Sequence, residues 1–189
     1  MAVSDLEQTI TAVQDAGGTL VTGPLEAGAD GRLAVLADDV GVAFCAWRAG
    51  ARRGAQLVNV PGTWAMSSLH TPSIERARAF YGAVFGWQLE PVPGAPFAFW
   101  RLPGYDGGEP EQLMPRDVVG VATPTDAGGV PPHWGVNFRV EDVDATADQA
   151  AALGGTVLMA PIDTPGFRSA VIGDPHGGVI AVSAPAAGR

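Results

Sequence analysis

The chain has 189 residues, of which 47% are hydrophobic and 16% are charged, a composition typical of a packed globular protein. Its net charge of -9 argues against a nucleic-acid or anionic-membrane surface, because both require clustered positive charge. The single cysteine, Cys45, excludes an internal disulfide and zinc sites built from cysteine pairs. No apolar run is long enough for a membrane span, and the N-terminus lacks the features of a signal peptide. We therefore expect a cytosolic protein with no nucleic-acid or membrane partner.

Two segments of the sequence repeat each other. Residues 3–25 match residues 140–162 in register, including a shared Gly-Gly-Thr. After a slip of one residue the match resumes, and residues 32–41 align with 168–177. Chance similarity does not keep register over such a length, so these are two copies of one supersecondary unit.

Each copy begins with a helix and continues with strands. In the first copy Ser4 and Glu7 have the spacing of a capping box, and in the second Asp142 precedes an alanine-rich run. A Gly-Gly pair ends each helix. The strands expected after the helices are 19–22, 33–36 and 42–47 in the first copy and 156–160, 169–172 and 179–183 in the second. With a strand expected before each helix, the order is βαβββ.

The middle of the chain holds a third, more diverged unit. A strand over 63–70 precedes a helix over 74–85, and Gly86 ends that helix. Further strands are expected over 87–90 and 97–102, with a weaker one within 112–122 and a Pro/Gly-rich connector over 123–132. The predicted fold class is α+β, with units at 1–50, 63–122 and 133–185 and a linker at 51–62.

Paired βαβββ units resemble the vicinal oxygen chelate superfamily, which includes glyoxalase I, bleomycin-resistance proteins and extradiol dioxygenases. Three motifs carry the resemblance: Thr71–Tyr81 followed by Phe85-Gly86-Trp87, then Val140–Ala145 with Gly154-Gly155, and Asp174-Pro175-His176-Gly177-Gly178. Within the superfamily the chain is similar to tandem, two-module glyoxalase-like proteins of high-GC bacteria, some of which are linked to antibiotic pathways.

The resemblance implies four units, whereas this chain has three. Residues 1–50 form half a module and residues 63–185 form a complete one, so the first quarter is missing. An unpaired half module exposes a hydrophobic sheet face, which is costly. Two interpretations remain open: a homodimer in which two half modules complete each other, and a truncated reading frame.

The resemblance also implies one divalent metal per module, held by His, Glu or Gln on the first and last strands, which would act as a Lewis acid. The corresponding positions here are Met66 and Gly135 on first strands and Cys45 and Ala181 on last strands. Glycine and alanine cannot coordinate a metal, and methionine suits only soft metals. We therefore predict no metal and no cofactor, which argues against glyoxalase I and extradiol dioxygenase activity.

Strand alternation predicts which side chains line the concave cavity instead. The predicted ligand-binding residues are Met66, Ser68, Phe97, Phe99, Arg101, His133, Asn137, Arg139, Ala181 and Ser183, with Trp47 and Cys45 in the half module. This set is partly aromatic, partly polar and contains cations. It suits a planar or amphipathic small molecule held by stacking and a few hydrogen bonds.

Three functions follow from these residues. The first is a binding protein for a hydrophobic or aromatic small molecule, in sequestration, resistance or an accessory role in secondary metabolism. The second is a metal-free cyclase or isomerase with His133 or Asp117 as the base. The third is a metal-dependent lyase or dioxygenase with those two residues as unusual ligands. Structural interpretations stand beside them, because His133 also fits a solvated strand end, His70 a loop residue and Arg139 a surface ion pair.

Overall fold

The computed structural model describes residues 1–107, 114–125 and 130–186. Within them it contains three α-helices and twelve strands, arranged as three βαβββ repeats, so the predicted α+β fold is confirmed. Two compact units are present. The first comprises 1–56, 69–107 and the described residues of 116–134; the second comprises 57–68 and the described residues of 108–115 and 135–189. Most of the second repeat therefore belongs to the same compact unit as the first repeat.

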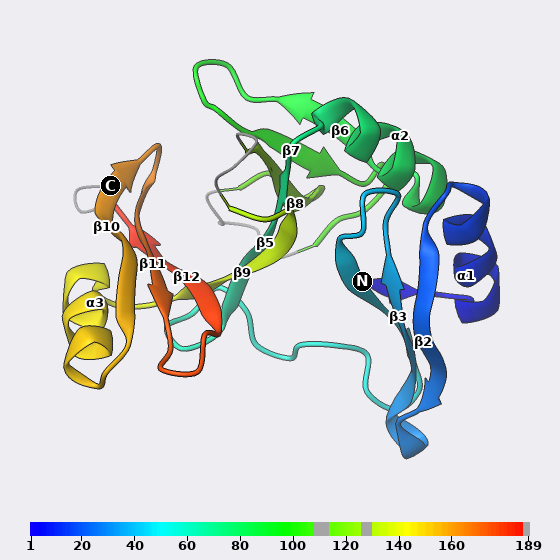
Figure 1. Ribbon diagram of the computed structural model, residues 1–189, viewed down its shortest axis with the longest axis horizontal. Coiled ribbons are helices and arrows are strands. Elements are labelled where there is room, and N and C mark those ends of the chain that lie inside the picture. The colour runs from blue at the N-terminus through cyan, green and yellow to red at the C-terminus, as the bar shows by residue number, and fades with distance from the viewer. Residues whose placement is uncertain (108–113, 126–129, 187–189) are drawn as a thin grey trace. The chain divides into compact units, whose positions relative to one another are not determined.

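The first repeat forms a four-stranded sheet covered by one helix (Figure 1). Its elements are β1 (Ala2–Val3), α1 (Leu6–Asp15), β2 (Thr19–Glu26), a 3-10 turn at Gly28–Asp30, β3 (Gly31–Ala37) and β4 (Ala43–Ala49). The strand order is β1-β4-β3-β2, with β1 parallel to β4. The cap predicted at Ser4 is wrong: Asp5 is the N-cap, and its carboxylate accepts the Gln8 amide at 2.9 Å.

The second repeat supplies a helix and an antiparallel meander. Its elements are β5 (Trp64–Thr71), α2 (Ile74–Phe85), β6 (Gln88–Pro91), β7 (Ala98–Arg101) and β8 (Val118–Pro124). Gly86 ends α2 in the left-handed conformation, at φ 69°, which glycine adopts without steric cost. The weaker predicted strand corresponds to β8. Residues 112–113 of that prediction and 126–129 of the predicted connector lie outside the described residues.

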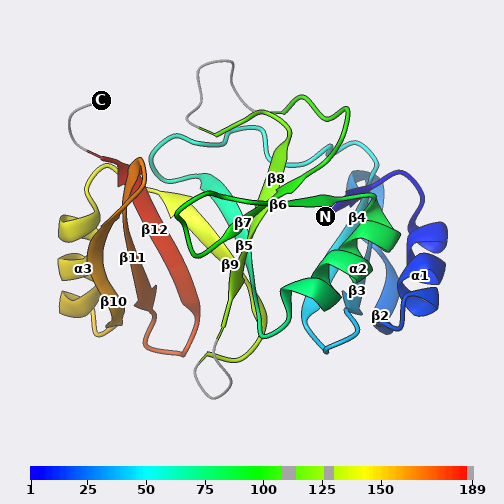
Figure 2. The same cartoon turned by 90° about the horizontal axis from the view of Figure 1, so that it is seen from above.

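The third repeat copies the arrangement of the first (Figure 2). Its elements are β9 (His133–Arg139), α3 (Val143–Ala152), β10 (Thr156–Thr164), β11 (Phe167–Gly173) and β12 (Val179–Pro185). The order β9-β12-β11-β10 matches β1-β4-β3-β2, with β9 parallel to β12. The Asp142 carboxylate caps α3 by accepting the Ala145 amide at 3.0 Å. Unlike β1, β9 has a second neighbour in its sheet, β5.

The two compact units have cores of different character. In the first unit, apolar side chains of α1, α2 and the sheets of the first two repeats form one cluster that includes Phe44, Tyr81 and Trp100. The core of the third repeat is smaller and aliphatic, built around Val143, Ala170, Val182 and Ala184. None of the helices in the described part of the chain has the length and hydropathy of a membrane-spanning segment.

Candidate functional site

The second compact unit brings together four side chains that we call the Arg139 cluster: Asn137 and Arg139 on β9, Ser183 on β12 and Phe167 at the start of β11. Pairing of β9 with β12 places Ser183 beside Arg139 and Ala181 beside Asn137. The Ser183 hydroxyl donates to the Asn137 side-chain oxygen at 2.8 Å, and the Arg139 guanidinium lies 3.5 Å from that hydroxyl. The guanidinium also lies over the Phe167 ring, 5.0 Å from its centroid, in cation–π contact.

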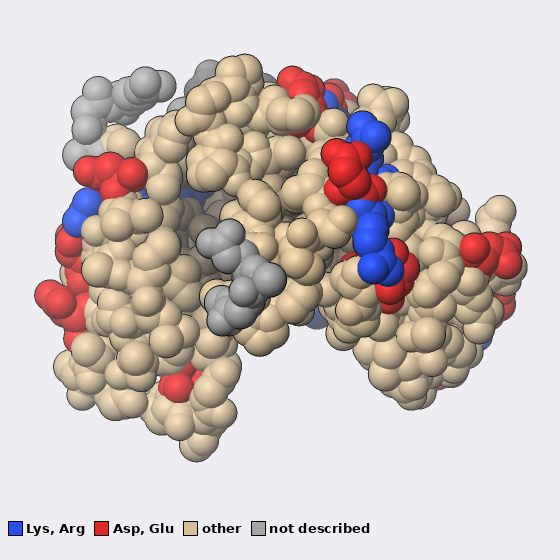
Figure 3. Space-filling view, turned by 45° about the horizontal axis from the view of Figure 1, so that its top comes forward, with Lys and Arg blue, Asp and Glu red and all other residues tan. Residues whose placement is uncertain are grey.

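Arg139 differs from most arginines of this protein in its electrostatic surroundings. Arg32, Arg76 and Arg168 each pair with carboxylates, and basic side chains in Figure 3 lie beside acidic ones. No described carboxylate pairs with Arg139, and burial lowers its pKa. Arginine nevertheless stays protonated. The cluster therefore contains a half-buried positive charge whose remaining donors suit a planar oxyanion such as a carboxylate or phenolate.

The residues at the expected metal-ligand positions do not fit a divalent metal. Met66, Gly135 and Ala181 all belong to the second unit and offer a single thioether among them. Nowhere in 1–107, 114–125 and 130–186 do three or more His, Cys, Asp or Glu side chains gather as a metal site would require. In the first repeat, Cys45 is exposed on β4. No chemistry through a metal can be built from these donors.

A second cluster, in the first compact unit, consists of His70 and His133. Their rings stack with centroids 4.6 Å apart and planes 5° from parallel. The His133 Nδ1 lies 2.8 Å from the Pro131 carbonyl oxygen; because a carbonyl only accepts, this assigns the proton to Nδ1 and leaves Nε2 as an acceptor. Burial, and secondarily His133, lowers the pKa of His70. The neutral form of His70 is thus favoured.

Three of the predicted cavity residues belong to the same unit: Phe99 and Arg101 lie on β7, and Phe97 directly precedes it. The rings of Phe97 and Phe99 contact each other at 5.8 Å, while the alternate residues Ala98 and Trp100 are buried. Arg101, the third, forms ion pairs with Glu90 and Asp117. These pairs compensate the charge of Arg101 and engage Asp117 in an ion pair.

The other predicted residues are distributed between the two units. Met66 and Ser68 lie half-buried on β5 in the second unit, and Trp47 lies on β4, where its indole donates to the Arg52 carbonyl at 3.1 Å. Sequence reasoning missed one contributor, Phe167, which lies outside the predicted strand that begins at Ser169. His70 lies within the predicted strand over 63–70, and β5 extends one residue beyond it. A predicted strand that began two residues earlier would have included Phe167.

A buried polar chain in the first unit was also missed. The Tyr81 hydroxyl donates to the Asp38 carboxylate at 3.0 Å and accepts from the Trp134 indole at 2.8 Å. Burial, and secondarily Asp38, raises the pKa of Tyr81 well above its ordinary value, so Tyr81 remains protonated. This polar chain joins all three repeats and is structural, because Asp38 and Tyr81 are buried and Trp134 packs against the core.

The fold and the repeated units define a class of protein, and comparison with known proteins agrees. A family model described as a glyoxalase-like domain matches residues 66–183. The chain therefore belongs to the glyoxalase-like family of the vicinal oxygen chelate superfamily. It is similar in fold to the Mn(II)-bound glyoxalase from Novosphingobium aromaticivorans, with a TM-score of 0.61 at 18% identity, covering 97% of this chain and 60% of that one. The 2,3-dioxygenase LapB from Pseudomonas sp. KL28 gives 0.60 at 14% identity, covering 95% and 67%.

Particular relatives have higher sequence identity. The chain is 37% identical over 180 residues to the anthracycline biosynthesis protein DauV of Streptomyces sp. (strain C5), covering 93% of this chain and 61% of that protein. It is 38% identical to the anthracycline biosynthesis protein DnrV of Streptomyces peucetius, with the same coverage. CFP32 of Mycobacterium tuberculosis (strain CDC 1551 / Oshkosh) is 36% identical over 191 residues, covering 98% and 68%. The chain thus spans less than two thirds of the two anthracycline proteins.

Proposed function

We propose that the protein binds a hydrophobic or aromatic small molecule without a metal, and that it acts in sequestration, resistance or as an accessory protein in secondary metabolism. The observation that carries this proposal is the Arg139 cluster, in which a half-buried guanidinium has an aromatic ring beneath it and no described carboxylate beside it. Similarity to two anthracycline biosynthesis proteins supports a planar aromatic ligand.

Each member of the cluster has a part in this proposal. Arg139 supplies charge-assisted donors to an anionic oxygen of the ligand, and the interaction is strengthened because the guanidinium is partly removed from water. Asn137 retains its amide donors while its oxygen accepts from Ser183. Phe167 holds the guanidinium plane and offers apolar surface. Gly135 and Ala181 stand at the expected positions of metal ligands and offer no ligating atom.

A metal-free acid–base enzyme is the second candidate. His133 favours it, because the hydrogen bond of Nδ1 to Pro131 leaves Nε2 available to accept a proton. The stacked His70, whose pKa is lowered, has no described carboxylate hydrogen-bonded to it that would orient it. Binding without turnover is therefore the function that the described residues support best.

The test is a titration of intrinsic tryptophan fluorescence with alizarin, a planar hydroxyanthraquinone that ionises to a phenolate, against anthraquinone, which cannot ionise. We expect alizarin to bind more tightly, and Arg139→Met to weaken alizarin binding about tenfold or more, as loss of a buried charge-assisted contact does. Arg48→Met is the matched control, because Arg48 is exposed on β4 and forms no ion pair among the described residues.

Two outcomes would contradict the proposal. One is equal affinity for both quinones in the wild-type protein, and the other is an Arg139→Met variant that binds alizarin as the wild type does. Liquid chromatography of the quinone after incubation distinguishes binding from turnover, because an isomerisation changes the retention time and not the mass. A new product peak that depends on His133 would favour the enzyme.

A further inference from the structure

The repeated sequences of the first and third repeats allow a position-by-position comparison of one face of each sheet. In register, Leu36, Asp38 and Phe44 of the first repeat correspond to Ile172, Asp174 and Ile180 of the third. In the first repeat these three residues are 0%, 4% and 6% exposed. In the third, Ile180 is 36% exposed and the neighbouring Val179 is 50% exposed. The same face is covered in one copy and open in the other.

Helix α2 of the second repeat covers the first copy. The Phe44 ring contacts the rings of Phe80, Tyr81 and Phe85 at centroid distances of 6.3, 5.9 and 5.9 Å. A polar contact accompanies this aromatic packing, since the Tyr81 hydroxyl donates to Asp38. The covering element is thus an amphipathic helix with aromatic residues on one face and a tyrosine hydroxyl aimed at the aspartate.

The turn aspartates show what the third repeat lacks. In the first repeat Asp38 Oδ1 accepts the amides of Val40 and Val42, and Oδ2 accepts the Tyr81 hydroxyl. In the third repeat Asp174 Oδ1 accepts the equivalent amides of His176 and Gly178, at 2.8 and 2.7 Å. Asp174 Oδ2 accepts no hydrogen bond from any described residue. The turn amides hold the two carboxylates alike, but only Asp38 also accepts a side-chain hydrogen bond, from the Tyr81 hydroxyl to Oδ2.

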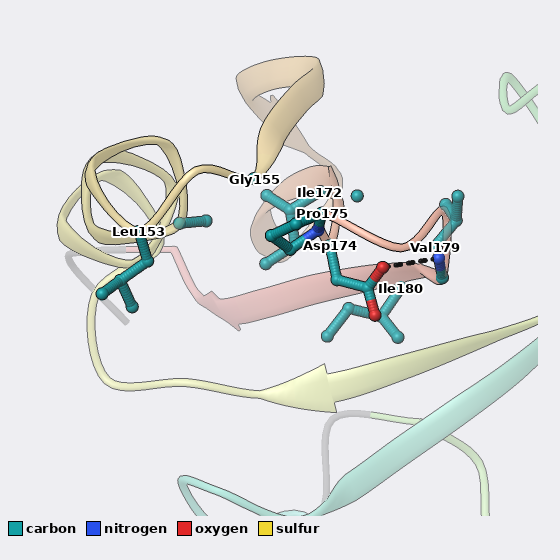
Figure 4. Close-up of a pocket in the computed structure, with 10 residues that line it drawn as sticks. Leu153, Gly155, Ile172, Asp174, Pro175, Val179 and Ile180 are labelled. Carbon is teal, nitrogen blue, oxygen red and sulfur yellow. Dashed lines mark hydrogen bonds between the residues drawn. The ribbon is translucent and has the colours of Figure 1, made fainter.

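The open face is hollowed. A depression of about 370 Å³ lies between the C-terminal end of α3 and the turn joining β11 to β12, as Figure 4 shows. Its apolar rim includes Leu153, which is 73% exposed, together with Val179 and Ile180. Gly178 stands where the first repeat has the buried Val42, so the third repeat lacks that apolar side chain beside the turn. Exposed apolar surface of this kind is costly unless something binds there.

We propose that this hollow is the docking site for the helix of a further βαβββ unit that resembles the second repeat. Aromatic side chains of that helix would pack against Ile180, and a hydroxyl group would donate a hydrogen bond to Asp174 Oδ2. Within this chain, a helix of that type is what covers the equivalent face. A second copy of the chain would not supply it, because its own α2 is engaged with its first repeat. The portion of the anthracycline relatives outside the match is longer than residues 1–50 and has room for such a unit.

The first repeat also has an open sheet edge, at β1. In the third repeat β9 lies beside β5, a strand of the second repeat, whereas its counterpart β1 ends its sheet. Val21 is 58% exposed and Cys45 is exposed. A unit of the second repeat's type could therefore add its first strand at β1, as β5 does at β9.

The probe for the docking site is a lactam-stapled helical peptide with the sequence of residues 72–87, labelled for fluorescence anisotropy and titrated with the full chain. We expect saturable binding that Ile180→Asp weakens about tenfold or more, as for a central apolar contact. Ile162→Asp is the matched control, because Ile162 is an exposed β10 residue that does not line the hollow. A double-mutant cycle pairing Tyr81→Phe in the peptide with Asp174→Ala in the chain should show coupling.

Three results would overturn the proposal. They are the absence of saturable binding, binding that Ile180→Asp leaves unchanged, and a homodimer of the wild-type chain, seen by sedimentation velocity, that Ile180→Asp dissociates. The last result would assign the hollow to a second copy of the chain. The proposal is independent of small-molecule binding, so Arg139→Met should leave peptide binding unchanged.

Discussion

The first and third repeats are two versions of one unit with different neighbours. Both have a capped helix, a Gly-Gly helix end and an aspartate that organises the turn before the last strand. In the first, α2 buries Phe44 and donates to Asp38; in the third, Ile180 and Asp174 face a hollow. The comparison teaches that the unit folds with its turn intact whether or not its apolar face is covered. The covering neighbour completes the unit and is not needed to shape it.

The largest expected difference is at the paired positions Phe44 and Ile180. Phe44→Ala should lower the free energy of unfolding by about 3–5 kcal/mol, because it leaves a cavity among three aromatic rings. Ile180→Ala should cost about 1 kcal/mol or less, since that side chain is already half open. Urea denaturation followed by circular dichroism measures both. Equal losses would show that both faces are covered in solution.

The turn aspartates should show a smaller contrast of the same kind. Asp38→Ala removes the acceptor of two amides and the buried Tyr81 hydroxyl, so we expect a loss of about 2–3 kcal/mol. Asp174→Ala leaves only two solvent-accessible amides without their acceptor and should cost less. Thermal unfolding of the two variants checks the order. A larger loss in Asp174→Ala would mean that Asp174 Oδ2 has a partner in solution.

Thiol labelling compares the opposite faces of the same two sheets. Cys45 and Ala181 are equivalent positions on the last strands, and Cys45 is exposed whereas Ala181 is half-buried beside Asn137. Native Cys45 should react with DTNB several-fold faster than the cysteine of Ala181→Cys in a Cys45→Ala background. If Cys45 were protected from labelling, the sheet face of the first repeat that carries Cys45 would be covered in solution. That result would favour the homodimer.

The smallest difference is expected at Arg32 and Arg168, where the two repeats agree. Arg32 pairs with Glu7 and Glu26, and Arg168 with two acids in the same arrangement. Arg32→Gln and Arg168→Gln should therefore lower the free energy of unfolding by small and similar amounts, and salt should reduce both effects.

The Arg32 pair should also make stability depend on pH. Arg32 lowers the pKa of Glu7, so this pair stabilises the protein above the ordinary carboxylate pKa. The contribution is lost as the pH falls through the lowered pKa. A chemical denaturation series at several pH values should show that loss in the wild type and not in Arg32→Gln.

Much of the fold was predictable because its signals are local. The repeated Gly-Gly pair has the same geometry in both copies, with Gly17 and Gly154 both at φ 87°. The structure shows the period of two along 97–100, since Ala98 and Trp100 are buried and Phe97 and Phe99 are only partly buried. The cap at Asp5 was misplaced by one residue, because Ser4 has the same short polar side chain and only backbone geometry decides between them.

The candidate site was only partly predictable, because charge compensation depends on distant residues. The sequence named Arg101 and Arg139 alike as cavity cations. The structure pairs Arg101 with Glu90 and Asp117 and leaves Arg139 over Phe167 with no described carboxylate. The register between neighbouring strands decides which carboxylates lie beside each arginine. The alternation of side chains along one strand does not reveal that register.

The βαβββ units, their family and the residue types at the expected metal-ligand positions could be predicted from sequence, since they depend on short-range patterns and residue chemistry. Which face of each repeat is covered depends on tertiary packing. Phe44 and Ile180 are both apolar residues on equivalent strands, yet only the first meets an aromatic helix. Whether an apolar residue is buried depends on the segment that packs over it as well as on the residue itself. That segment can lie far away in the sequence.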